Sequence, residues 1–245
     1  MSNTNLIRIY VDKSLKHNEE IILINNHHHY LKNVMRIKKG EHISIFNGKD
    51  GEWSAKIVKI SKSSIITTID DKLMDQNISP DIWLIFAPIK KDKLNILVQK
   101  CTELGVRKFI PIISERTNVK NINISNLRKN AIESAEQCMR LDIPEIEKEI
   151  KLENYFNNWP NDRCILFCDE QNLKGISLVK QLNIIKNKFS KWGIIIGPEG
   201  GLTKKERKSI LKLTNIFPVS LGSRILKSDT AATVSLYCIQ EIVDN

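Results

Sequence analysis

The amino-acid sequence predicts an α/β protein in which a small β-barrel precedes a mostly parallel sheet with helices on both faces. Three observations support this fold class. Short alternating segments fill the first seventy positions, a polar stretch over residues 70–81 follows, and apolar strands then alternate with helical patterns. A period of two is typical of half-exposed strands, whereas strand–helix alternation is typical of a parallel sheet. We therefore expect one domain over residues 1–72 and a second over residues 80–245.

The first domain is expected to consist of short strands joined by tight turns, with one short helix over residues 28–35. Asn47-Gly48 and Asp50-Gly51 are turn dipeptides that favour a hairpin. Strands this short and closely spaced favour a barrel. They are predicted over residues 6–11, 20–24, 42–46, 52–60 and 64–69.

Beyond Pro80 the sequence changes to a strand–helix rhythm, and residues 70–81 are the predicted linker. The strands are continuously apolar, as expected for a parallel sheet that is buried on both faces. They are predicted over residues 82–89, 109–113, 163–168, 192–197 and 216–221. The helices are predicted over residues 93–104, 125–139, 176–188, 203–213 and 228–243.

The charge balance favours a polyanionic partner. The 245 residues include 38 Lys and Arg against 28 Asp and Glu, so the formal net charge is 38 − 28 = +10. The basic residues are spread along the chain, and nucleic acid is the first candidate partner for such a protein. A general enrichment in Lys, Asn and Ile explains the same charge without a partner, so charge alone leaves both interpretations open.

The cysteines and histidines do not predict a disulfide framework or a metal site. An odd number of cysteines without a C-x-x-C pair fits neither a disulfide scaffold nor zinc. The run over residues 27–29, three histidines, is interpreted as a helix start, and no metal is expected. The first residues lack an apolar signal region, and runs such as residues 194–196 are strand-sized. We therefore expect a cytoplasmic protein.

A glycine-rich turn is the first candidate site. Residues 192–206 have the sequence WGIIIGPEGGLTKKE, in which a buried strand leads into a turn with three glycines. Thr203 and Glu206 have the spacing of a capping box, which predicts a helix start. Ligands bind at the carboxyl ends of strands in open α/β sheets. The turn matches neither the dinucleotide fingerprint nor the P-loop pattern, so a purely structural turn stays an alternative.

A second turn of the same design follows the next strand. Residues 218–232, PVSLGSRILKSDTAA, combine a strand, a turn at Gly222 and a helix that starts at Ser228 or Asp229. We expect these two polar-tipped turns to follow adjacent strands and to close around one small molecule.

These two segments, IGPEGGLTKKE and LGSRILKSDTA, resemble the signature of the SPOUT class of RNA methyltransferases. Within that class the chain is most similar to the bacterial enzymes that methylate N3 of a uridine in 16S ribosomal RNA. Residues 100–111 (KCTELGVRKFIP), residues 133–140 (ESAEQCMR) and residues 34–36 (VMR) resemble further segments of these enzymes. The chain departs from the common form at Tyr30, where His is expected. It also departs at Lys227, Ser228 and Asp229, where Arg, Thr and Glu are usual.

The resemblance implies a PUA-like, RNA-binding β-barrel and a methyltransferase domain with a deep C-terminal trefoil knot. It also implies a homodimer that binds S-adenosyl-L-methionine, with 16S rRNA in the small ribosomal subunit as partner. By position, the cofactor loops are residues 166–169, 196–201 and 221–226. The implied cofactor-binding residues are Leu166, Phe167, Ile196, Gly197, Pro198, Gly200, Gly201, Leu221, Gly222, Ile225 and Leu226.

Three residues are candidates for the chemistry. Glu199 is expected to contact the base or, alternatively, to shape its own turn by accepting local N–H groups. Arg140 and Arg224 are expected to offset charge on the base or grip a phosphate; for Arg140, a salt bridge to Glu133 or Glu136 of its own helix is the alternative. Asp229 is interpreted as a helix cap. The expected RNA-binding residues are Arg8, Arg36, Lys90, Lys91 and Arg116.

Several functions remain open on the sequence. A related methyltransferase that acts on transfer RNA or on a ribose 2′-OH is the nearest alternative, and a non-catalytic RNA-binding protein is another. A nucleotide-phosphate enzyme is disfavoured because the glycine turn lacks a P-loop lysine. The residues by themselves do not identify the target nucleotide or the group that removes the proton from N3.

Overall fold

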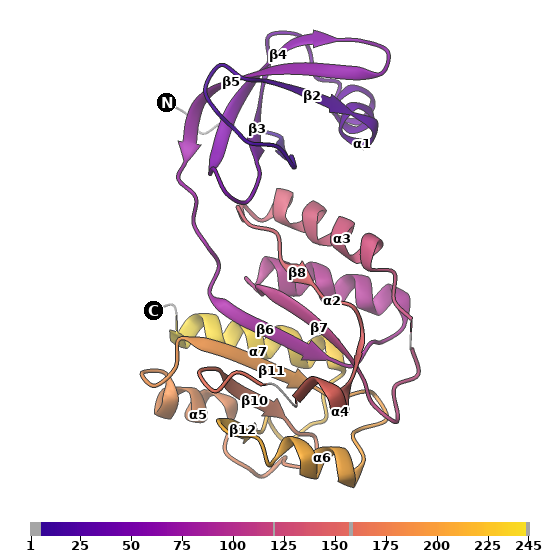
Figure 1. The fold of residues 1–245 in the computed structure, drawn as a ribbon, viewed down its shortest axis with the longest axis vertical. Helices are drawn as coiled ribbons and strands as arrows, with labels where there is room; N and C mark the ends of the chain where they lie inside the picture. The colour runs from indigo at the N-terminus through magenta and orange to yellow at the C-terminus, as the bar shows by residue number, and fades with distance from the viewer. Residues whose placement is uncertain (1–5, 120, 157–158, 244–245) are drawn as a thin grey trace. The chain divides into compact units, whose positions relative to one another are not determined.

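The computed structural model describes residues 6–119, 121–156 and 159–243. Figure 1 shows its helices and strands. The chain forms two compact units, one made of Met1–Ile78 with Ala135–Asp142 and the other of Ser79–Ser134 with Ile143–Asn245. The first unit therefore includes a short segment that lies within the residues 80–245 expected for the second domain.

The first unit is built on a curled five-stranded sheet with the strand order β1-β3-β4-β5-β2. β1 (Arg8–Tyr10) pairs in parallel with β3 (His42–Phe46). β4 (Glu52–Ile60) and β5 (Ser64–Met74) continue the sheet antiparallel, and β2 (Glu20–Ile24) forms its other edge. The sheet encloses apolar side chains from every strand, which confirms the predicted β-rich first part of the fold.

A short helical segment, α1 (Asn25–His29) and the π-helical turn Tyr30–Val34, packs on this sheet through the fully buried Leu31. The predicted linker is wrong in its first part, because β5 extends to Met74 and Lys72 pairs with Trp53. Strand pairing uses backbone groups, and the side chains at the end of β5 are exposed, so polar residues are tolerated there.

The second unit contains a parallel sheet with the strand order β12-β10-β11-β6-β7-β8. All described strand pairs in this sheet are parallel, as the sequence predicts, and β9 (Ile150–Lys151) adds a short parallel pair to β7. The other strands are β6 (Asp81–Phe86), β7 (Lys108–Ile113), β8 (Glu145–Ile146), β10 (Cys164–Cys168), β11 (Lys191–Ile196) and β12 (Ile216–Val219).

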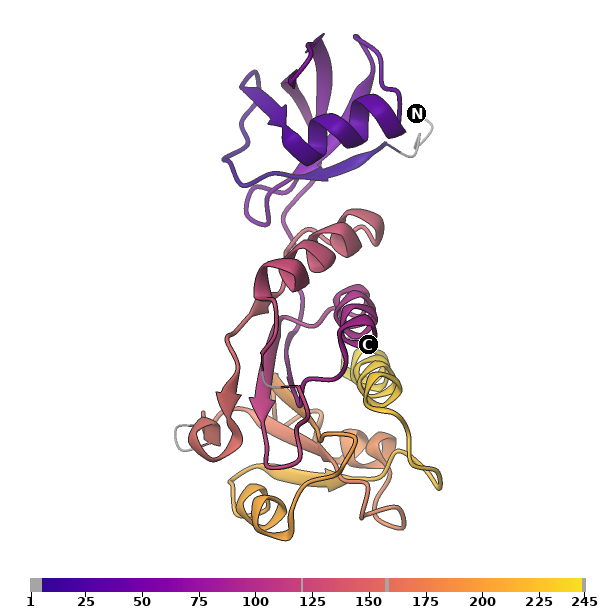
Figure 2. The same cartoon turned by 90° about the vertical axis from the view of Figure 1, so that its right-hand side faces the viewer.

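Helices cover both faces of this sheet (Figure 2). On one face an apolar core joins the strands to α2 (Lys91–Glu103), α3 (Ile124–Gln137), α5 (Leu178–Ile185) and α7 (Ser228–Val243). On the other face Leu152 of α4 (Leu152–Tyr155) and Ile210 of α6 (Lys204–Ile210) belong to a second core. The predicted two-sided architecture is confirmed.

The sequence did not predict β8, β9 or α4. Each two-residue strand is too short to show a period, and α4 forms only one turn. Within the described residues, no helix is long and apolar enough to cross a membrane, and no group of three or more His, Cys, Asp or Glu side chains is placed to hold a metal.

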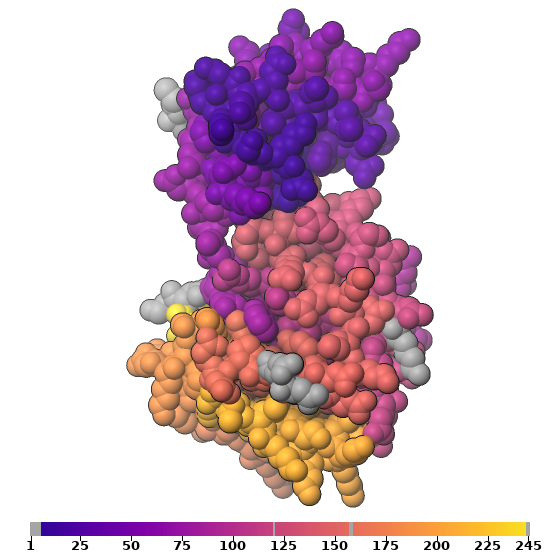
Figure 3. Space-filling model, viewed as in Figure 1, coloured from indigo at the N-terminus to yellow at the C-terminus, as the bar shows by residue number. Residues whose placement is uncertain are grey.

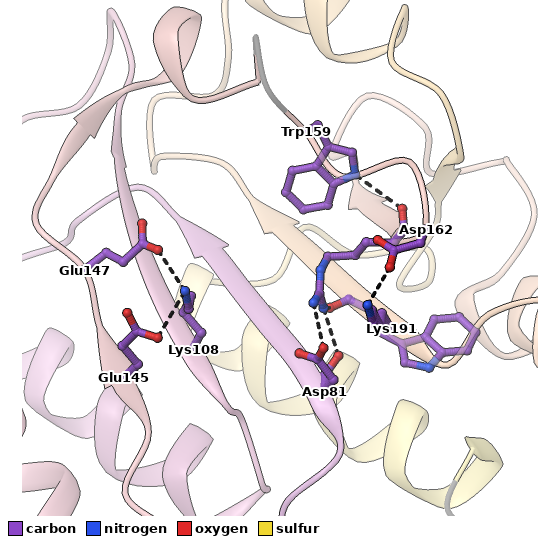
Figure 4. A network of polar contacts seen from close by, with 9 residues as sticks. Asp81, Lys108, Glu145, Glu147, Trp159, Asp162 and Lys191 are labelled. Atoms are coloured by element: carbon purple, nitrogen blue, oxygen red, sulfur yellow. Dashed lines mark hydrogen bonds and ion pairs between the residues drawn. The ribbon is translucent and has the colours of Figure 1, made fainter.

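A charged network fixes the amino edge of the second sheet, where its strands begin (Figure 4). The Arg163 side chain, 3% exposed, forms an ion pair with Asp81 at 2.8 Å and donates to the Trp192 carbonyl at 3.0 Å. Arg163 and Lys108 both lie over the ring of Trp83, 3.5 and 4.7 Å from its centroid. Lys108 also pairs with two glutamates, Glu145 and Glu147. The opposite, carboxyl edge is left for the candidate site.

Candidate active site

Three loops meet at the carboxyl edge of the second sheet, after β10, β11 and β12. The two glycine turns do not follow adjacent strands as the sequence analysis expected, because β10 lies between β11 and β12. Strand order depends on how the chain crosses over the sheet, and hydrophobic periodicity does not encode that path. The loop after β10 is therefore flanked by the strands that lead into the glycine turns.

The turn after β11 requires glycine at Gly201. This residue has φ +69°, and its N–H donates to the Pro198 carbonyl at 2.8 Å. A Cβ at Gly201 would lie 2.7 Å from Oε1 of Glu170, in the loop after β10. Gly197 and Gly200 do not have this left-handed backbone. The glycine turn is thus packed closely against the neighbouring loop.

The predicted capping box is present at the start of α6. Glu206 Oε2 accepts the Thr203 N–H at 2.9 Å, and the Thr203 hydroxyl accepts the Glu206 N–H at 3.3 Å. The other oxygen of Glu206 accepts the N–H of Glu115 at 2.8 Å, and Arg116 donates to the Gly200 carbonyl at 3.1 Å. The segment after β7 is therefore fastened to the glycine turn, and the exposed Arg116 lies beside it.

The loop after β10 is held by an ion pair that the sequence analysis missed. Asp169 is 3% exposed, and its Oδ2 lies 2.6 Å from Nη2 of Arg207 on α6. The hydrogen bond from Arg207 to Asp169 raises the pKa of the guanidinium. The two residues are 38 positions apart, so no local sequence signal indicated the pair.

The loop after β12 contacts both of the others. The Ser220 hydroxyl donates to the Leu173 carbonyl at 2.9 Å and accepts the N–H of Gly222 at 3.2 Å. Gly222 has φ +117°, a conformation that side chains disfavour. At the start of α7, the Ser228 hydroxyl donates to the Gly197 carbonyl at 3.3 Å. Hydrogen bonds therefore join the β12 loop to the loops after β10 and β11.

The expected cofactor-binding residues offer mainly backbone groups. The side chains of Leu166, Phe167 and Ile196 are at most 3% exposed and pack in the apolar cores. Ile225, in contrast, is 71% exposed. Apart from the four glycines, the remaining residues are Pro198, which is buried, and Leu221 and Leu226, which are half-buried against the core. A ligand at these loops would contact peptide edges and one exposed apolar side chain.

Glu199 is paired with a lysine that the sequence analysis did not select. Its Oε1 lies 3.0 Å from Nζ of Lys93 in the first turn of α2, and both side chains are nearly half exposed. The hydrogen bond to Glu199 is the main reason that the pKa of Lys93 is raised, and the charge of Asp229 contributes. The sequence signal that could have indicated Lys93 is its position soon after the carboxyl end of β6, close to Lys90 and Lys91.

The other polar candidates at this edge differ in their contacts. Asp229 lies in the first turn of α7, and its Oδ1 is buried without a hydrogen-bond partner among the described residues. No cap hydrogen bond from its side chain is described. Arg224 is exposed, with no described ion pair or hydrogen bond from its side chain, and Lys90 and Lys91 are exposed where α2 begins.

Arg140 and Arg8 lie in the first unit and are engaged there. Arg140 is 8% exposed and pairs with Asp142, its Nη2 at 2.9 Å from Oδ2. Asp142 is a partner that the sequence analysis did not name for Arg140. Arg8 pairs with Glu52 at 2.8 Å, with both side chains less than a tenth exposed.

Arg8 also donates to the carbonyls of Ala135 and Arg140 and lies over the Phe46 ring. Ser44 donates to the same glutamate, Glu52. This burial argues against the expected RNA contact by Arg8. Arg36, by contrast, is exposed and has φ +53°.

The carboxyl edge combines backbone groups on three hydrogen-bonded loops with the carboxylates of Glu199 and Asp229 and the ammonium group of Lys93. Such a set can bind a small ligand that has hydrogen-bonding edges and a positive charge, because a partly buried carboxylate favours a cationic partner. The Lys93–Glu199 pair can also place a charge close to a reacting group.

Comparison with known proteins identifies the family. Residues 77–240 match the model of an RNA methyltransferase domain, and residues 29–70 match that of an RNA methyltransferase PUA domain. The chain is 35% identical over 230 residues to the ribosomal RNA small subunit methyltransferase E of Rickettsia conorii, covering 94% of this chain and 93% of that protein. It is 32% identical over 248 residues to the protein of the same name from Buchnera aphidicola, covering 98% and 95% of the two chains.

The fold agrees with a solved structure. The ribosomal RNA small subunit methyltransferase E of Neisseria gonorrhoeae, crystallised with S-adenosyl methionine, has a TM-score of 0.86 to this chain at 26% identity. The likeness covers 97% of this chain and 98% of the other. It confirms the resemblance and the fold class that the glycine-turn motifs indicated. The chain belongs to the ribosomal RNA small subunit methyltransferase E family of RNA methyltransferases.

Proposed function

We propose that this protein transfers a methyl group from S-adenosyl-L-methionine to N3 of a uridine in 16S rRNA of the small ribosomal subunit. The observation that carries the proposal is the set of three interlocked loops at the carboxyl edge, with Lys93 and Glu199 beside them. The names of the relatives support small subunit rRNA as the substrate. The cofactor in the Neisseria gonorrhoeae structure supports the methyl donor.

The residues at these loops fit the cofactor. The position of a Cβ on Gly222 has no heavy atom within 4 Å, so there is open space beside the β12 turn. Ile225 offers an exposed apolar surface for an adenine ring, and the unpaired Oδ1 of Asp229 offers an acceptor for an amino group. When bound, the cofactor supplies an electrophilic methyl group on a sulfonium. The protein supplies position and electrostatics.

Methylation of N3 requires loss of the proton that uracil carries there. In the proposed mechanism, Glu199 accepts this proton or orients the N3–H group, and Lys93 keeps the carboxylate in place. Negative charge that develops on O2 and O4 is offset by the Lys93 ammonium and by the exposed Arg224. Because N3 takes part in base pairing, the target uridine must be unpaired or flipped out when it binds.

The RNA contacts are proposed for both parts of the chain. Residues 1–72 form the RNA-binding domain with Arg36 as one contact, and residues 80–245 form the catalytic domain with Lys90, Lys91 and Arg116 near the base. We assign Arg8 and Arg140 to the stability of the first unit, because both are buried and ion-paired.

Three further features belong to the same proposal: a homodimer, a trefoil knot in the C-terminal domain, and a cytoplasmic location where small subunits are available. Val234 and Tyr237 support a subunit interface, since both are exposed on α7 one turn apart. Sedimentation of the purified protein tests the dimer, and a monomer at micromolar concentration would contradict it.

The function is tested by tritium transfer from labelled S-adenosyl-L-methionine to small subunits from a strain that lacks this gene. We expect one methyl group per subunit with the wild-type protein. Gly200→Val should abolish transfer, because its side chain would meet Arg116, whose Cβ lies 3.4 Å from the Cβ position. Calorimetry of cofactor binding is the parallel measurement. A protein that binds the cofactor but transfers no methyl to subunits or naked rRNA would contradict the ribosomal assignment and point to transfer RNA.

A further inference from the structure

The segment of α6 and the turn after it carries a strong positive charge on its outer side. It contains five basic residues and one acid, Glu206. Glu206 is 9% exposed, and its carboxylate accepts the N–H groups of Thr203 and Glu115. Arg207 is paired with Asp169. The four lysines have no described ionic partner within the part of the chain that the structure describes: Lys204, Lys205, Lys208 and Lys212.

These cations border a groove on the surface of the second unit. The groove is a pocket of about 360 Å³, on the segment that Figure 3 shows in golden colours at the surface. Three of the four lysines line it, and Leu211 is its one apolar residue. The lining residues are Gln171, Lys204, Arg207, Lys208, Leu211 and Lys212.

The groove adjoins the candidate active site. Gln171 belongs to the loop after β10, and Arg207 binds Asp169 of the same loop. Lys204 and Lys208 lie one turn apart on α6, and Lys212 follows in the turn after the helix, where it also lines the groove. Like charges at this spacing repel one another and disfavour the helix. A bound polyanion would remove this repulsion.

We propose that this groove binds the phosphate backbone of the substrate RNA next to the target uridine, an inference that rests on the proposed function. Three lysines line the groove, and their flexible side chains can bring ammonium groups to phosphates that lie along it. It contains only one apolar side chain, whereas a membrane-binding helix needs a continuous apolar face. An RNA strand that lies along this groove would contact basic side chains up to the loops after β10 and β11.

The test compares two triple variants with the same change in net charge. The first is Lys204→Ala, Lys208→Ala and Lys212→Ala in the groove. The control is Lys180→Ala, Lys186→Ala and Lys188→Ala on and just after α5, which packs on the opposite face of the sheet. These control lysines are likewise exposed and have no described ion pair.

The affinity for rRNA extracted from small subunits is measured over a series of salt concentrations. We expect the groove variant to bind rRNA about tenfold more weakly near physiological salt. The slope of the logarithm of affinity against the logarithm of salt concentration should fall in magnitude by about 2 to 3, one for each lost phosphate contact. The KM for subunits should rise in parallel, and the affinity for S-adenosyl-L-methionine should stay the same. The control should change the affinity for RNA less than twofold.

Equal effects of the two triple variants would overturn the proposal, because net charge alone would then explain them. A defect with intact subunits that is absent with naked rRNA would also overturn it, in favour of an acidic protein partner. Failure of the proposed function has a different signature: wild-type protein that binds rRNA but transfers no methyl group. Wild-type protein that does not bind rRNA would overturn both.

Discussion

Nζ of Lys93 lies 3.0 Å from Oε1 of Glu199, which joins the first turn of α2 to the glycine turn after β11. The two residues are 106 positions apart, and the pair connects elements that follow two neighbouring strands, β6 and β11. In the proposed reaction this contact sets the position of the carboxylate that faces the base.

The first prediction concerns this pair. Glu199→Gln should lower kcat by roughly a hundredfold, the lower range for a general acid–base group. Lys93→Met should lower kcat as well, and the double variant should lose less than the two single losses combined, because Lys93 acts in part by holding the Glu199 carboxylate. Single-turnover methyl transfer measures these rates. Additive effects of the two changes would contradict the coupling.

Lys100→Met is the control for the loss of a lysine on the same helix, because Lys100 pairs with Glu103 at the other end of α2. We expect it to leave the rate unchanged. The melting temperature should change little in all of these variants, since exposed ion pairs contribute little to stability.

The second prediction concerns the glycine turn. Gly201→Ala should lower the free energy of unfolding by about 1–2 kcal/mol, because alanine disfavours a left-handed backbone. It should also weaken cofactor binding at least tenfold, because the new Cβ displaces Glu170 and shifts the loop after β10. Calorimetry measures the cofactor affinity.

Gly40→Ala is the matched control for backbone strain. Gly40 has φ +91° in the first unit, and a Cβ there meets nothing within 4 Å. This variant should be destabilised to a similar degree but bind the cofactor normally. If both variants bound the cofactor equally well, the turn would not be part of the cofactor site.

The third prediction separates two arginines that the sequence analysis treated alike. Arg8→Met should destabilise the first unit by about 3 kcal/mol, because it leaves Glu52 buried without its partner. Arg36→Met should leave stability unchanged and weaken RNA binding, since Arg36 is exposed. Urea unfolding and filter binding of rRNA measure the two effects. The assignment fails if Arg8→Met is as stable as the wild type.

The fourth prediction concerns the amino edge. Arg163→Met should lower stability by about 3 kcal/mol, because Asp81 and the Trp192 carbonyl lose their donor. Lys191→Met breaks an exposed ion pair with Asp162 on the same edge and should have little effect. Cofactor affinity at low temperature should be normal in both variants. A lower affinity in Arg163→Met would mean that the two edges of the sheet are coupled.

The sequence was informative where local chemistry decides the structure. The strands over residues 20–24, 42–46 and 52–60 have the predicted bounds, because alternation and turn dipeptides are local signals. The capping box of Thr203 and Glu206 was predicted from its spacing. The glycine turns were selected correctly as the features of the carboxyl edge, although their cofactor contacts stay a prediction.

The sequence was uninformative where distant residues meet. Lys93–Glu199 and Asp169–Arg207 join positions that no spacing rule connects. The central place of β10 in the sheet depends on chain crossovers. The burial of Arg8 could not be predicted, because an arginine in an alternating strand looks the same whether its side chain faces solvent or a buried glutamate.

The most direct test of the central claim is the identity of the methylated nucleoside. Small subunits from a strain without this gene are incubated with the protein and S-adenosyl-L-methionine, and their rRNA is digested for nucleoside mass spectrometry. We expect one 3-methyluridine per subunit, formed roughly a hundredfold more slowly with Glu199→Gln. A 2′-O-methylated nucleoside, or a methyl group at another position of uracil, would contradict the account, because neither requires removal of the N3 proton.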